Sequence, residues 1–72
     1  MTKALSTYLM ALLGTESGSM PRLIGEQVWG LTISNRAGVP DYLDSVMATN
    51  PTNSRAFEVA SDIRMLMGGV AA

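Results

Sequence analysis

NSRAFEVASDIRMLMGG, residues 53–69, is the stretch whose pattern decides the fold class. Its apolar residues recur every three or four positions and fall within an arc of about 120°, which is typical of a helix with one face in a core. These residues are Ala56, Val59, Ala60, Ile63, Leu66 and Met67, and Val70 would extend the same face. Thr52 or Asn53 is expected to cap the start of the helix, and Gly68-Gly69 to stop its end. We therefore predict an amphipathic helix over residues 53–67.

Two large apolar residues of this helix, Phe57 and Met65, fall on its polar side. They share that side with Arg55, Glu58, Ser61, Asp62 and Arg64. An apolar side chain there has no obvious place in a core within the chain, so contact with another protein is one interpretation. Simple exposure is the other, because single exposed apolar residues are common on soluble proteins. Phe57 and Met65 are therefore candidate protein-contact residues.

Another helix is predicted directly before this one, over residues 39–49. Pro40 suits the first turn of a helix, where its missing N–H group has no helical partner to lose. Asp41 and Asp44 place negative charge near the N-terminus, which the helix dipole favours. One apolar face is formed by Val39, Tyr42, Leu43, Val46 and Met47. Asn50-Pro51 ends the helix, because the residue before a proline is pushed out of the helical region.

Residues 20–34 are predicted to form an extended strand or a small β-hairpin. In a helix, their apolar residues would scatter around the whole circumference, and two glycines would interrupt it. In a strand, Trp29, Leu31 and Ile33 share one face through the period of two, and Gly25-Glu26 suits a type II′ turn. The open edge of such a hairpin pairs either within the chain or with another chain.

Trp29, Leu31 and Ile33 are the remaining candidate protein-contact residues. Trp29 is the single tryptophan of the chain, and tryptophan is enriched among the residues that dominate binding energy at interfaces. The alternative is that Trp29 belongs to the core, where the lone tryptophan of a small chain is more often found.

The first segment, residues 2–13, is predicted to be a helix with an apolar surface about twice as wide as a single core contact needs. Its polar strip holds Lys3, Ser6 and Thr7, with Met10 among them. We expect this helix to be buried on more than one side. A partner helix, a neighbouring subunit or a membrane surface would supply the cover, unless the rest of the chain wraps around it.

The four segments predict one small domain over residues 1–72 with a mainly α fold. It has about three short helices, with one extended strand or small hairpin between the first and second helix. A domain of this size has a marginal core, and natural proteins of this length usually add disulfides, a metal or a partner subunit. The chain contains no Cys and no His, so disulfides and the usual zinc, haem and iron–sulfur ligand sets are excluded. A protein partner is the support that remains.

Composition also limits the kind of protein. Catalysis with a His base or a Cys nucleophile is excluded, and no calcium loop or phosphate-binding motif is present, so we expect neither an enzyme nor a cofactor. The five basic residues are scattered, which argues against nucleic acid. The longest apolar stretch is about half the ~20 residues that a membrane span needs. Charged residues make up only 15% of the chain, against about 25% in ordinary soluble domains.

Our leading functional hypothesis is a small structural or assembly protein that acts through protein contacts, as a subunit of a larger repetitive complex such as a virus or phage particle. It would form a homo- or hetero-oligomer and be found in a virion or in the cytoplasm. One alternative is a small soluble inhibitor or adaptor that binds a target protein. Another is a peripheral accessory subunit of a membrane complex, with residues 2–13 lying in the membrane interface.

Overall fold

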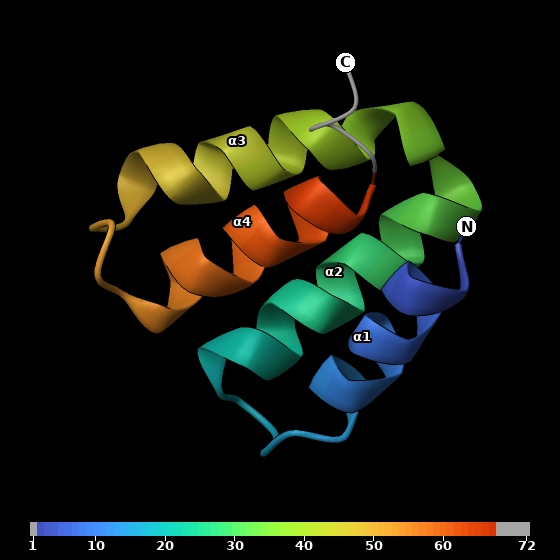
Figure 1. Cartoon of the computed structure of the whole chain (residues 1–72), viewed down its shortest axis with the longest axis horizontal. Helices are drawn as coiled ribbons and strands as arrows, with labels where there is room; N and C mark the ends of the chain where they lie inside the picture. The colour runs from blue at the N-terminus through green and yellow to red at the C-terminus, as the bar shows by residue number, and fades with distance from the viewer. Residues whose placement is uncertain (1, 68–72) are drawn as a thin grey trace.

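Four α-helices and one short 3₁₀ helix make up residues 2–67, the part of the chain that the computed structural model describes. In chain order they are α1 (Lys3–Leu13), α2 (Met20–Ser34), η1 (Arg36–Gly38), α3 (Val39–Thr49) and α4 (Arg55–Leu66). α1 packs mainly on α2 and α3 mainly on α4, while α2 and α4 join the two pairs (Figure 1). The expectation of a mainly α fold is confirmed: residues 2–67 contain helices and no strand.

The predicted strand or hairpin over residues 20–34 is wrong, because this segment forms α2, the longest of the helices described. The hydroxyl oxygen of Ser19 accepts a hydrogen bond from the backbone N–H of Arg22 and caps the helix. Pro21 lies in the first turn, where a proline does not interrupt the hydrogen bonding. The apolar residues scatter around α2 because several of them, Leu23, Trp29 and Ile33 among them, are exposed rather than buried. Ile24 and Val28 are buried in the core, and Gly25 lies against α1.

Gly25 is a site of close helix contact rather than part of a turn. A Cβ atom added at this position would lie 2.7 Å from the Cβ atom of Leu12 in α1. Real side chains do not approach so closely, so only glycine allows α1 and α2 to pack at this distance. This contact fixes the register of the two helices, with Leu12 level with Gly25.

Helices also form within the other three predicted segments, as α1, α3 and α4. The cap of α4 differs from the expected one. Ser54 accepts a hydrogen bond from the backbone N–H of Phe57, instead of Thr52 or Asn53. α4 ends at Leu66, and the predicted Gly68-Gly69 stop lies outside the described residues.

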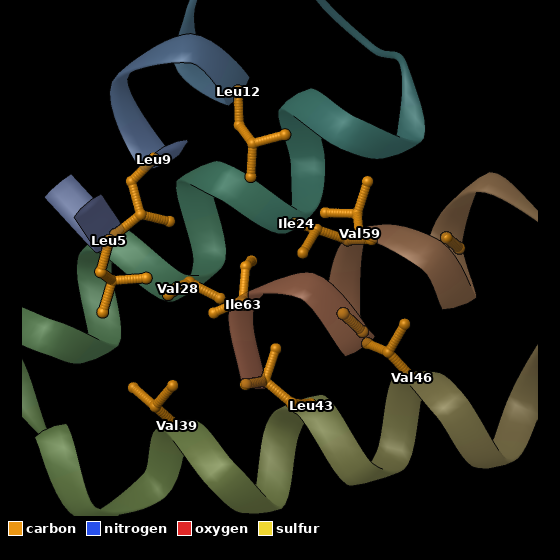
Figure 2. Close-up of a cluster of buried hydrophobic side chains, with 12 residues drawn as sticks. Leu5, Leu9, Leu12, Ile24, Val28, Val39, Leu43, Val46, Val59 and Ile63 are labelled. Atoms are coloured by element: carbon orange, nitrogen blue, oxygen red, sulfur yellow. The ribbon is translucent and has the colours of Figure 1, made fainter. Parts of the chain in front are cut away.

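The core lies where all four helices meet and is entirely apolar in the described part of the chain (Figure 2). Its buried residues are Leu5, Leu9, Leu12, Ile24, Val28, Val39, Leu43, Val46, Ala56, Val59, Ala60 and Ile63. No polar or charged residue among residues 2–67 is buried with them. The core therefore carries no desolvated charge that would need a buried partner.

The rest of the chain does not wrap around the first helix, so that alternative is wrong, and cover by another protein stays a prediction. α1 buries Leu5, Leu9 and Leu12 along one face, while Ala4, Met10 and Ala11 are exposed. Because alanine side chains are small, most of the outward apolar surface of α1 is ordinary helix surface. Met10 is its large exposed apolar side chain among the described residues.

The two glycines of α2 make a matched test of the close contact. Gly25→Ala should destabilise the fold by about 1–3 kcal/mol, the usual cost of overpacking a core, because its new methyl group meets Leu12. Gly30→Ala is the control, since nothing lies within 4 Å of a Cβ atom there. It should instead stabilise the helix by up to about 1 kcal/mol, because alanine has the higher helix propensity. Urea unfolding followed by circular dichroism measures both changes, and equal stability of the two variants would contradict the close contact.

Candidate protein-contact surface

Trp29 and Ile33 lie one turn apart on the outward side of α2, with exposed fractions of 36% and 73%. Leu31 is half-buried and packs against the core. Two residues rotate a helix by about 200°, so Leu31 faces away from both. The shared face expected for Trp29, Leu31 and Ile33 in a strand is therefore wrong, and the helix keeps Trp29 and Ile33 together.

Phe57 and Met65 lie on a different helix, in the first and last turns of α4. Phe57 is half-buried and lines an open cavity of about 330 Å³ at the start of α4. Met65 is exposed to 57%. The five predicted contact residues therefore do not form one surface in the structure.

Met10 is a surface residue that the sequence did not single out. Its side chain is 59% exposed, comparable with Met65. A signal was present, because Met10 stands among the polar residues on the helical wheel of residues 2–13. Whether Met10 can share a surface with Trp29 and Ile33 depends on which flank of α1 the neighbouring helices leave open.

A hydrogen bond shows which flank of α1 turns toward α4. The hydroxyl of Tyr8 donates to Oδ2 of Asp62 in α4, over a distance of 3.0 Å. Leu9, the next residue, is buried. Because each residue turns a helix by about 100°, Met10 lies about 200° from Tyr8 and therefore on the flank away from α4.

The Gly25 contact places Trp29 and Ile33 on the same side of the molecule as Met10. Trp29 follows Gly25 by one turn, so it lies on the flank of α2 next to α1, and Ile33 continues outward from it. α1 and α2 run in opposite directions (Figure 1), so, with Leu12 level with Gly25, Met10 and Trp29 lie within about one helical turn of each other along the helix axes. We call this surface, made by Met10, Trp29 and Ile33, the outer face of the α1–α2 pair.

Arginine and acidic side chains of α2, α3 and α4 form salt bridges on the surface of the described residues. Arg22 and Glu26 pair within α2 at 2.8 Å, and Arg22 also donates to the backbone oxygen of Thr15 at 3.1 Å. Arg55 pairs with Glu58 within α4. Arg64 of α4 reaches Asp44 of α3 at 3.3 Å. Exposed pairs of this kind contribute little to stability, roughly 0–1 kcal/mol each.

The Tyr8 hydroxyl has a strongly shifted pKa. Burial, followed by the hydrogen bond to Asp62, raises the pKa of Tyr8 to about 12. Burial alone raises the pKa of Tyr42 in α3. Because the folded state holds the proton of Tyr8 more tightly than the unfolded chain, its contribution to stability is complete below pH 10 and is lost between pH 10 and about 12. Tyr8 therefore ties α1 to α4 throughout the neutral range.

Two cavities open on the surface of the described residues. The cavity of about 330 Å³ is lined mainly by polar side chains, among them Ser54, Ser61 and Asp62. Another, of about 450 Å³, lies between Leu5, Leu66 and Met67, with Thr2 and Arg36 also lining it. In residues 2–67, no three acidic side chains gather as a metal site would need, and no helix has the length and apolar character to cross a membrane.

The sequence matches no protein-family model, and neither a curated protein nor a solved structure resembles it. The function is therefore inferred from the molecule itself. The outer face of the α1–α2 pair is the best-defined surface available for that inference.

Replacing Asp62 tests the bond that orients α1. Asp62→Ala should lower the pKa of Tyr8 from about 12 toward its ordinary value, because the acceptor and its negative charge are removed while part of the burial remains. The pH dependence of tyrosinate absorbance measures the change. Glu58→Ala is the control, since Glu58 is a nearby carboxylate that does not hydrogen-bond to Tyr8, and its effect should be much smaller. An unchanged titration in Asp62→Ala would contradict the Tyr8–Asp62 bond.

Proposed function

We propose that this chain is a small structural or assembly protein that acts through contacts with other proteins, as a subunit of a larger repetitive complex. The observation that carries the proposal is the outer face of the α1–α2 pair, where Met10, Trp29 and Ile33 present apolar surface on adjacent helices. The low charge of the chain, 15% of residues, supports it, because a free monomer of this size normally covers its surface with charge. A virus or phage particle is a setting that suits such a subunit.

The surface available for protein contact is helical and not the edge of a strand. The unpaired strand that would have joined another chain is absent, because residues 20–34 are helical. The contact surface is instead a pair of helices that carry apolar side chains outward. Packing of one helix pair on another is a common way to join helical proteins, and it uses the same side-chain interdigitation as a protein core.

The all-apolar core supports a second candidate function, a soluble inhibitor or adaptor that folds alone. Core side chains come from all four helices, and none of the buried residues among 2–67 is polar. A chain that completes its core without help could present Trp29 and Ile33 to a single target protein. In that case the outer face would be a binding site for a target rather than a subunit interface.

The third hypothesis, a helix in a membrane interface, loses its main support. Such a helix needs a broad outward apolar face. α1 instead turns Leu5, Leu9 and Leu12 into the core, and its outward side carries Met10 together with Lys3, Ala4, Thr7 and Ala11.

Sedimentation velocity over a concentration series, with circular dichroism alongside, separates the two leading functions. A subunit should show a mass above that of one chain at micromolar concentration. Helicity should stay constant as the mass rises, because one copy already completes its core. Repeating the series at high salt is the control, since apolar contacts persist while association through exposed charges is screened. A folded monomer at every concentration would contradict the subunit proposal and favour the adaptor.

A further inference from the structure

The outer face of the α1–α2 pair has the layout of an interface, with apolar residues at its centre and charges at its ends. Met10 and Trp29 lie at nearly the same height, and Ile33 is one turn beyond Trp29. Lys3 is at the N-terminal end of α1. Glu16 is in the loop at the other end, next to Thr15, which Arg22 holds against α2. Interfaces commonly show this arrangement of an apolar centre and a polar rim.

We propose that the outer face binds a second copy of this chain, through a twofold axis that runs α1 antiparallel to α1 of the second copy. This inference rests on the proposed function and names its partner. Under such an axis, a residue of one copy meets a residue of the other copy that lies at an equal distance on the opposite side of the axis. The face must therefore be complementary to itself.

The charges at its two ends are complementary under this axis. Lys3 and Glu16 are both exposed, and neither forms a salt bridge within the described residues. The antiparallel arrangement brings Lys3 of each copy to Glu16 of the other, so two ion pairs form at the rim. A parallel arrangement would instead place Lys3 beside Lys3 and Glu16 beside Glu16, which like-charge repulsion disfavours.

The same axis also places the apolar residues at the centre. The midpoint between residues 3 and 16 falls beside Met10, so the two Met10 side chains meet near the axis, and Trp29 lies within about one turn of it. On α2, Ile33 lies about as far to one side of the level of Met10 as Arg22 lies to the other. Ile33 of one copy therefore packs on the aliphatic stem of Arg22 of the other, while the Arg22 guanidinium keeps its partner Glu26.

The size and net charge of the molecule suit this contact. A standard interface removes about 800 Å² from each partner. This is roughly a fifth of the 4370 Å² surface, an area that one face of a four-helix molecule supplies. The formal net charge of −1 adds little repulsion between copies, and a net charge near zero promotes association.

Three single substitutions to glutamate test the face by sedimentation equilibrium. Wild-type protein should have twice the mass of one chain, whereas Met10→Glu and Ile33→Glu should raise the dissociation constant at least tenfold, because they put charge at the centre of the contact. Met65→Glu is the matched control: Met65 has a similar exposure to Met10 but lies on α4, so its dimer should remain. Circular dichroism should show equal helicity in all four proteins. Trp29 fluorescence should shift to shorter wavelength as the wild type associates and not in Ile33→Glu.

A charge exchange tests the twofold arrangement. Lys3→Glu and Glu16→Lys should each weaken the dimer at low salt, and the double variant Lys3→Glu with Glu16→Lys should restore it. No recovery in the double variant would overturn the antiparallel arrangement, and equal disruption by Met65→Glu would overturn the choice of face. A larger assembly that survives Met10→Glu and Ile33→Glu overturns this inference and leaves the proposed function standing. Monomers at every concentration would contradict both.

Discussion

Helices α1 and α2 approach each other closely because Gly25 has no side chain at the point where Leu12 sits. The contact brings Leu9 and Leu12 of α1 into one core with Val28 of α2 (Figure 2). A larger residue at position 25 would push the helices apart and open space beneath them. The same contact sets the register that brings Met10 level with Trp29. One missing methyl group therefore shapes both the core and the surface.

The rest of the core is built from ordinary helix packing. α4 lies against α1, α2 and α3, and its residues Val59 and Ile63 have no exposed surface (Figure 1). The Tyr8–Asp62 bond and the Arg64–Asp44 pair join α4 to α1 and α3 at the edges of the core. The chain contains no cysteine and no histidine, so this packing replaces the disulfides or metal that many domains of this length use.

Most of the acidic side chains on the surface have partners within the chain. The carboxylates of Glu26, Asp44 and Glu58 are exposed and paired with arginine, and Asp62 accepts from Tyr8. These partners give four of the six acidic residues a structural role. In contrast, the exposed side chains of Met10, Trp29 and Ile33 have no role in the core, and they gather on adjacent helices. The low charge of the chain and this apolar face are the two features on which the proposed association between copies rests.

The sequence by itself determined the three helices within residues 2–13, 39–49 and 53–67. In 39–49 and 53–67 the apolar residues form one clear stripe, and in 2–13 no glycine or proline interrupts a strongly apolar run. It named Trp29 and Ile33 as contact candidates, but on the face of a strand that the structure does not contain, and their part in a contact stays a prediction. Only the tertiary structure decided residues 20–34. The buried Ile24, Val28 and half-buried Leu31 form one stripe along α2, but exposed apolar side chains on its other sides obscure that stripe in the sequence. Gly25 resembles a turn residue until Leu12 is placed beside it. Met10 was missed for a different reason, because only the positions of α2 and α4 show which flank of α1 stays open.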